Sequence, residues 1–203
     1  MDGVVIKKKI ASNRVLFSFL EVNVENVLPF TKRYKMQVIG IDPGLNYTGW
    51  GVISSTGPNV SYLGSGVCKT SPKDELSVRL VSILNQLREV LNAFDLQSAA
   101  IEKTFVKSDP SAALKLGQAR AAAIISLGER NLSVAEYSPN YIKKVVSGRG
   151  HATKEEIQKM ISIQFPRVKL DRSDESDAIA IALCHLHSSK MKDSLSKAIE
   201  RAI

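Results

Sequence analysis

The order of apolar segments after residue 35 is the feature that most constrains how this chain can fold. Short apolar runs bounded by turn residues predict β-strands, and longer runs with apolar residues three and four apart predict α-helices. The predicted strands are Val38–Ile41, Gly49–Ser54, Val60–Thr70, Ser98–Glu102 and Leu132–Tyr137. The predicted helices are Leu80–Phe94, Ser111–Glu129, Pro139–Val146, Thr153–Phe165 and Ser173–His187. This order predicts an α/β fold with a mixed five-stranded sheet flanked by helices.

The pattern also divides the chain into a body and two flanking segments. Residues 36–189 are the predicted globular domain, and residues 190–203 are predicted to form a polar, frayed tail. Residues 1–35 combine a basic start, a short apolar stretch and a broken polar run. They are expected to be a disordered extension or the result of a start codon assigned too early, with Met36 as the working start. No apolar run approaches the roughly 20 residues that span a bilayer, so we expect no membrane insertion.

The charge of the chain favours a polyanionic partner without identifying it. The formal net charge is +8 and the isoelectric point is about 9.5. Half of that charge lies in residues 1–35, so the remaining 168 residues carry only +4. Charge alone therefore makes nucleic acid little better than an even choice. The two cysteines, Cys68 and Cys184, are too few for a disulfide framework and are expected to be buried thiols in a reducing compartment.

Four acidic residues stand where acids are costly. Asp42 and Glu102 each end an apolar strand, and Asp174 and Asp177 lie three apart, on one face of a predicted helix that continues into apolar residues. Burying several carboxylates together costs several kcal/mol per group or forces protonation. Hard divalent cations such as Mg²⁺ or Mn²⁺ remove that conflict. The set therefore indicates a metal site built from three separate elements.

Each acid also has an ordinary structural explanation. Asp42 precedes Pro43-Gly44 and suits a turn, Glu102 could pair with Lys103, and Asp174 could interact with the helix dipole. These explanations account for the residues one at a time. They do not account for the joint occurrence of acids on two strand ends and one helix.

Several longer motifs occur in order between about Met36 and Ser188. They are Gly40–Gly44 (GIDPG), Thr48–Ile53 (TGWGVI), Tyr62–Gly66 (YLGSG), Ala100–Glu102 with Phe105, Ala112–Arg120 (AALKLGQAR) and Asp174–Ala182 (DESDAIAIA). Together these segments resemble one known family, the RuvC-type Holliday junction resolvases.

The resemblance implies an RNase H-like fold and a homodimer that nicks two opposing strands of a four-way DNA junction in recombination and repair. It further implies that Asp42, Glu102, Asp174 and Asp177 are the catalytic set and bind the metal, expected to be two Mg²⁺ per site with Mn²⁺ as a substitute. The products would carry 5′-phosphate and 3′-hydroxyl ends. A bacterial cytoplasm and the branch-migration partners RuvA and RuvB are implied by the family alone.

The same resemblance suggests DNA-contacting residues near the acids. Phe105 would stack on bases near the cut, Lys107 follows it on the same loop, and Lys143 and Lys154 would contact phosphates. A core position remains the alternative for Phe105. Neighbouring basic residues such as Lys144 are expected to be solvated. His185 and His187, two apart on a helix, do not share a face and are not expected to bind zinc.

Two other functions remain open on the sequence. Asp42-Pro43-Gly44 also resembles the first phosphate loop of actin-like and sugar kinases, but those enzymes need a second such half. A junction-binding protein without chemistry is the other alternative, and the presence of all four acids argues against it. Nicking of a four-way junction, ATP turnover or binding alone would separate the three functions.

Overall fold

A computed structural model describes residues 35–103 and 109–202 of the 203-residue chain. Five strands are present in this part: β1 (Lys35–Asp42), β2 (Tyr47–Thr56), β3 (Asn59–Lys69), β4 (Ser98–Glu102) and β5 (Val134–Tyr137). Five helices accompany them: α1 (Leu76–Ala93), α2 (Pro110–Glu129), α3 (Pro139–Ser147), α4 (Lys154–Gln164) and α5 (Ser173–Ala202). The predicted α/β class and the number and order of elements are confirmed.

The five strands form one mixed sheet in the order β3-β2-β1-β4-β5. β1 pairs antiparallel with β2 and parallel with β4, so it lies at the centre of the sheet. β2 and β3 form an antiparallel hairpin, and β4 and β5 are parallel. The carboxyl ends of β1 and β4 therefore meet at one edge of the sheet, next to the start of β2.

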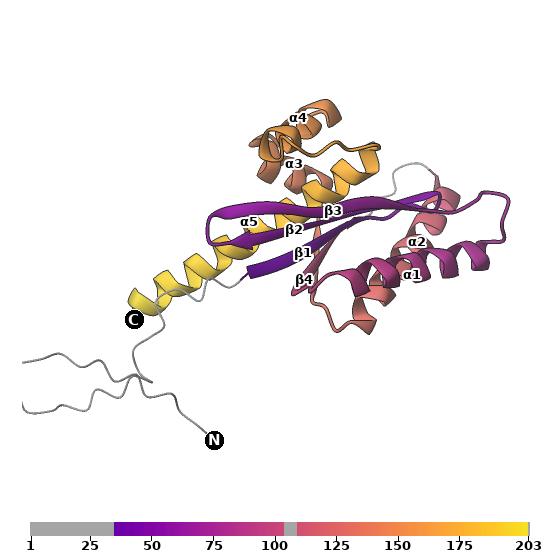
Figure 1. Cartoon of the computed structure of the whole chain (residues 1–203), viewed down its shortest axis with the longest axis horizontal. Coiled ribbons are helices and arrows are strands. Elements are labelled where there is room, and N and C mark those ends of the chain that lie inside the picture. The colour runs from indigo at the N-terminus through magenta and orange to yellow at the C-terminus, as the bar shows by residue number, and fades with distance from the viewer. Residues whose placement is uncertain (1–34, 104–108, 203) are drawn as a thin grey trace, which may run out of the picture. The chain divides into compact units, whose positions relative to one another are not determined.

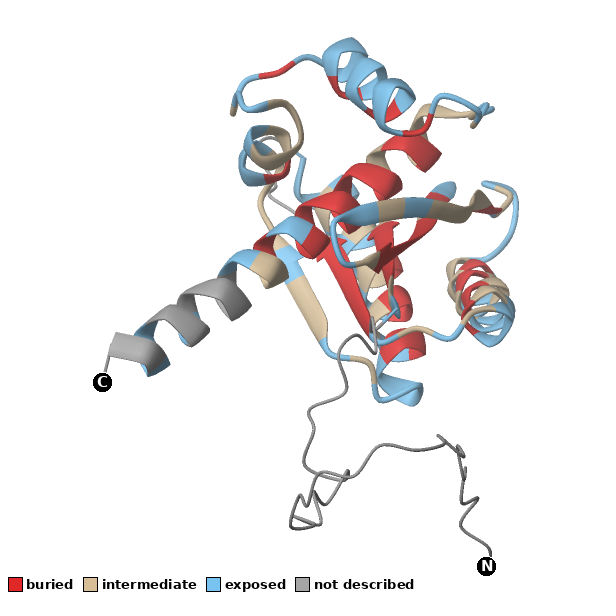
Figure 2. Cartoon of the chain, turned by 60° about the vertical axis from the view of Figure 1, so that its left-hand side comes forward, coloured by how far each residue is buried: buried red, intermediate tan, exposed pale blue. Residues whose placement is uncertain are grey.

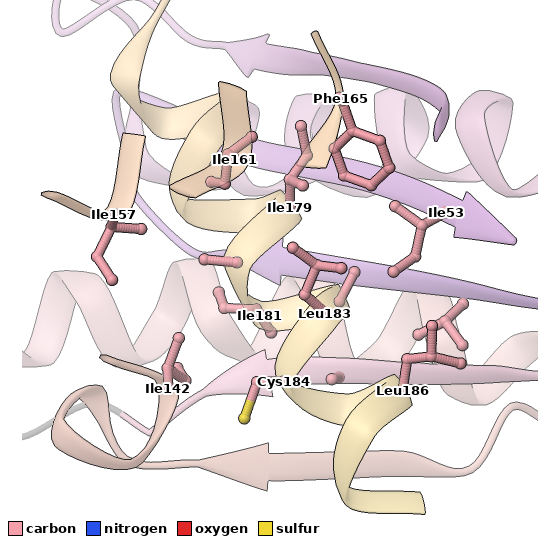
Figure 3. Close-up of a cluster of buried hydrophobic side chains, with 14 of the residues drawn as sticks. Ile53, Ile142, Ile157, Ile161, Phe165, Ile179, Ile181, Leu183, Cys184 and Leu186 are labelled. Carbon is pink, nitrogen blue, oxygen red and sulfur yellow. The ribbon is translucent and has the colours of Figure 1, made fainter. Parts of the chain in front are cut away.

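Helices cover both faces of the sheet (Figure 1). Helices α1 and α2 pack on one face, where alternate strand residues such as Ile39, Ile41 and Ile101 join their buried side chains. On the other face lies α5, whose first half is buried while α3 and α4 pack against it (Figure 2). The residues of that second core include Ile53, Ile142, Ile157, Ile161, Phe165, Ile179 and Ile181 (Figure 3).

Local sequence signals explain where several helices begin. Asp109 caps α2 by accepting hydrogen bonds from the backbone N–H groups of Ser111 and Ala112, and Pro110 follows at the first helical position. Thr153 and Glu156 form a reciprocal capping box at the start of α4. Gly148 ends α3 in the left-handed conformation, with φ of 79°, which a glycine adopts without strain.

Some sequence-based expectations are corrected or lie outside the described residues. The prediction that the last helix ends near His187 and gives way to a frayed tail is wrong, because α5 continues to Ala202. Phe105, Lys107 and residues 1–34 lie outside the described part of the chain. Cys68 and Cys184 are buried free thiols, as predicted. Within the described residues no helix combines the length and apolarity needed to cross a membrane.

Candidate active site

Asp42 and Glu102 end the two central parallel strands side by side. Ile41 pairs in register with Ile101, so the next residue of each strand is the acid. Because alternate residues of a strand share a face, Asp42 lies on the face of Gly40, and Glu102 lies on the face of Ala100. That face is the one covered by α5, since Gly40 meets Ala178 and Ala182 and Ala100 belongs to the core of α5. Both carboxylates therefore project toward α5.

A glycine face on β1 and β2 lets α5 approach the sheet closely. A Cβ atom added at Gly40 would lie 2.5 Å from the backbone nitrogen of Ala182, and one at Gly51 would lie 2.7 Å from Cγ1 of Ile179. A Cβ at Gly49, which pairs with Asp42, would lie 2.7 Å from the carbonyl carbon of Asp174. No side chain fits at these positions, so the backbone of the helix rests directly on the strands. The start of α5 is thereby placed beside Asp42.

The start of α5 holds three acids with two different orientations. Asp174 and Asp177 are partly exposed, whereas Glu175 is buried and accepts a hydrogen bond from the Ser65 hydroxyl at 2.6 Å. Tyr62 in turn shares a hydrogen bond of 2.9 Å with Ser65. Glu175 therefore attaches the helix to β3, while Asp174 and Asp177 face the strand ends.

The loop that follows Asp42 is held by polar contacts from both sides. Thr48 donates its hydroxyl to the carbonyl of Gly44 at 2.7 Å. The largely buried Arg79 of α1 donates to the side chains of Asn46 and Thr70 at 2.5 and 3.0 Å. These bonds fix the turn that leads away from Asp42, which restricts where its carboxylate can lie.

Asp42 has the most perturbed pKa of the site. The pKa of its carboxyl is raised from 3.8 to about 8, first by burial and then by the negative charges of Glu102, Asp177 and Asp174, while Lys154 opposes the rise. All three other predicted acids therefore act on Asp42. A carboxyl in such surroundings keeps its proton at neutral pH unless a cation arrives.

Glu102 is perturbed in the same direction. Burial and the charge of Asp177 raise its pKa, while Lys143 and Lys154 oppose the rise. The pKa of Lys154 is itself raised: burial lowers it, but the hydrogen bond and charge of Asp177 outweigh that effect. The acids and lysines form one coupled electrostatic group.

Two of the acids are engaged by cations. Lys154 Nζ lies 2.7 Å from Oδ2 of Asp177, and Nε of Arg172 donates to Oδ2 of Asp174 at 3.0 Å. Glu102, Asp177, Lys143 and Lys154 line a cavity of about 220 Å³ beside α5. With the carboxylates engaged in this way, no three His, Cys, Asp or Glu side chains of the described residues are grouped closely enough to hold a metal.

The donor set nevertheless suits a hard cation. It consists of carboxylate oxygens, which Mg²⁺ and Mn²⁺ select, and the raised pKa of Asp42 is the electrostatic conflict that a divalent ion relieves. Asp174 and Asp177 would supply the remaining oxygens, with the Asp177 side chain moving away from Lys154. Asp42, Glu102, Asp174 and Asp177 are thus the residues that could hold the metal.

The raised pKa of Asp42 leads to a prediction for the metal-free protein. Between pH 3.8 and about 8 the folded state keeps this proton while the unfolded chain releases it. The free energy of unfolding should therefore fall as the pH rises through that window. Thermal unfolding in a chelator at pH 5 to 8 measures the trend, and Asp42→Asn should flatten it. An equally steep decline in the variant would contradict the assignment.

The structure also places the other sequence-predicted residues. Lys143 and Lys154 lie at the cavity beside the acids, whereas Lys144 is exposed. His185 is buried, with Nδ1 within 2.9 Å of the Tyr137 hydroxyl, and thus lies among core contacts.

Sequence reasoning missed the supporting residues of the site. Glu175 lies between Asp174 and Asp177 in the sequence, and this spacing puts it on another face of the helix. Gly49 and Gly51 lie two residues apart in β2, on the same sheet face as Gly40 of β1. This spacing of glycines predicts that a helix packs closely on that face. Arg172 gave no signal, because its aromatic partner Tyr47 comes from a distant element.

Comparison with known proteins identifies relatives along most of the chain. Residues 38–185 match the family model described as crossover junction endodeoxyribonuclease RuvC. The RuvC of Cereibacter sphaeroides is 45% identical over 167 residues, covering 82% of this chain and 99% of the relative. The RuvC of Brucella ovis is 45% identical over 152 residues, covering 75% and 88%.

Solved structures agree with this similarity. RuvC of T. thermophilus in complex with a Holliday junction substrate matches with a TM-score of 0.73 and 34% identity, covering 77% of this chain and 96% of that one. The yeast mitochondrial Holliday junction resolvase matches with a TM-score of 0.53 and 14% identity, covering 73% and 78%, which supports the fold alone. The predicted RNase H-like fold is confirmed.

Proposed function

Because the chain belongs to the RuvC family of crossover junction endodeoxyribonucleases, we propose that it resolves Holliday junctions in recombination and repair. It hydrolyses phosphodiester bonds by paired nicks in opposing strands of a four-way junction and leaves 5′-phosphate and 3′-hydroxyl ends. The observation that carries this proposal is the charge coupling at one sheet edge, where Glu102, Asp174 and Asp177 all raise the pKa of Asp42.

The metal ligands in this proposal are Asp42, Glu102, Asp174 and Asp177. Mg²⁺, with two ions per site and Mn²⁺ as a substitute, would activate the attacking water and stabilise the leaving oxygen. Asp42 lies on the central strand of the sheet and would be the central ligand of this set. Glu175 is outside the set, because its carboxylate is committed to Ser65.

Basic residues beside the acids position the DNA. Lys143 and Lys154 line the cavity shared with Glu102 and Asp177, so a phosphate bound there would lie next to the carboxylates. Lys154 would exchange its bond with Asp177 for one to the phosphate when the acid takes up its metal. Phe105 and Lys107 remain proposed DNA contacts from the family resemblance, outside the described residues.

The assembly is proposed to be a homodimer. A four-way junction has approximate two-fold symmetry, so a two-fold dimer presents one site to each of two opposing strands. RuvA and RuvB are the proposed branch-migration partners and a bacterial cytoplasm the proposed location, both by family. Residues 36–189 are proposed as the nuclease domain, between an N-terminal extension and a C-terminal segment of α5.

A nicking assay tests the function. With Mg²⁺, the protein should cut a synthetic four-way junction symmetrically and leave a linear duplex of the same sequence intact, and a chelator should abolish the cuts. A ligase should reseal the products, since the ends carry 5′-phosphate and 3′-hydroxyl groups. Equal cutting of junction and duplex, binding without cutting, or ATP turnover without cutting would each contradict the proposal.

A further inference from the structure

Arg172 occupies an unusual position beside the acids. Its guanidinium carbon lies 3.8 Å from the centre of the Tyr47 ring, and its Nε donates to Oδ2 of Asp174 at 3.0 Å. Both partners of the stack reach solvent, since 37% of the Arg172 side chain and 41% of Tyr47 are exposed. The aromatic ring holds the cation at the surface instead of letting it move freely.

The sheet order places this pair and the lysines on two sides of Asp42. Tyr47 begins β2, which neighbours β1 on one side. Glu102 ends β4 on the other side, and it shares its cavity with Lys143 and Lys154. A single chain of DNA that crosses the ends of β4, β1 and β2 would therefore contact the lysines on the β4 side and Arg172 on the β2 side.

The chemistry of the guanidinium allows it to bind two anions at once. Arginine has five N–H donors in a planar fork, and the contact with Asp174 is made through Nε. Stacking on Tyr47 orients the plane of the fork and leaves its edge available to an incoming phosphate. The ammonium group of a lysine would have neither the planar stacking on the ring nor the fork of N–H donors.

We infer that Arg172, held on the Tyr47 ring, is a further phosphate-binding residue for junction DNA on the β2 side of the acids. The inference rests on the proposed junction-cleaving function and adds a contact to it. The alternative is that Arg172 only neutralises Asp174 at the start of α5. The two differ in one measurable property, because only a phosphate contact contributes to the salt dependence of DNA binding.

The test measures binding of a four-way junction by fluorescence anisotropy from 50 to 200 mM salt. All variants are made in the full chain with Glu102→Gln, so that the protein binds the junction in Mg²⁺ without cutting it. Each lost phosphate contact lowers the slope of log affinity against log salt by about 0.9, so a dimer losing one at each site changes by about 2. Arg172→Gln should show this decrease together with binding about 5- to 10-fold weaker at low salt. Arg172→Lys should retain most of the slope.

Matched variants separate a phosphate contact from a loss of charge. Lys169→Gln removes one exposed positive charge three residues away and should leave the slope unchanged. Tyr47→Phe keeps the ring and should bind as the parent does, whereas Tyr47→Leu should lose part of the affinity. An unchanged slope in Arg172→Gln, or an equal decrease in Lys169→Gln, overturns the inference. Failure of the Glu102→Gln parent to prefer the junction would instead contradict the proposed function.

Discussion

Replacing Asp42 by asparagine should slow junction cleavage by at least about 1000-fold while leaving junction binding within about threefold of the parent. Asparagine has nearly the same shape but only one neutral oxygen to offer, so the proposed central metal ligand is lost. The variant also lacks the carboxylate whose pKa burial and the neighbouring negative charges raise to about 8. We therefore expect the metal-free variant to unfold at a higher temperature than the parent near pH 8.

The opposite directions of the two effects make the result informative. Substituting a residue that serves only the fold would lower the stability and the activity of the protein together. Substituting a functional carboxylate should lower the activity and raise the stability. Asp171→Asn is the matched control, because it makes the same chemical change on an exposed acid just before α5. Near-normal cleavage in Asp42→Asn, or equal losses in both variants, would contradict the assignment. Rates and melting curves are measured on the same preparations.

Gly49→Ala should have the second largest effect, lowering the cleavage rate by about 100-fold. The added methyl group would lie 2.7 Å from the carbonyl carbon of Asp174, so the first turn of α5 must move away from β2. A displacement of about 1 Å at a catalytic group is enough for such a loss. Overpacking against backbone should also cost about 1–3 kcal/mol of stability.

The control for Gly49→Ala is another glycine replaced in the same way. Gly128 lies in α2, and a Cβ atom added there meets nothing within 4 Å. Gly128→Ala should cut junctions normally and gain up to about 1 kcal/mol of stability from helix propensity. Assays are run well below both melting temperatures, so that the rate reports the placement of Asp174. A Gly49→Ala protein that is folded and fully active would show that α5 does not need this close approach.

Local signals were sufficient for most of the secondary structure, and they led to the proposal of the four acids as metal ligands. The ends of β1 and β4 were visible because each apolar strand stops at a carboxylate, and helix starts follow from capping residues such as Thr153. The end of α5 was not visible. Residues after His187 are mostly polar, and the sequence therefore resembles a tail, but the chain remains helical to Ala202.

What the amino-acid sequence determined by itself is the order of elements and the sheet class, together with the proposal of four acids as metal ligands, because periodicity and turn chemistry act between neighbouring residues. Only the tertiary structure decided that Glu175 bonds to Ser65 while Asp177 meets Lys154. The same holds for the contact of Gly49 with α5 and for the stack of Arg172 on Tyr47. These pairings join residues about 20 to 125 positions apart, as in Lys154–Asp177, Ser65–Glu175 and Tyr47–Arg172. Their partners are selected by strand register and helix packing, which no local pattern encodes.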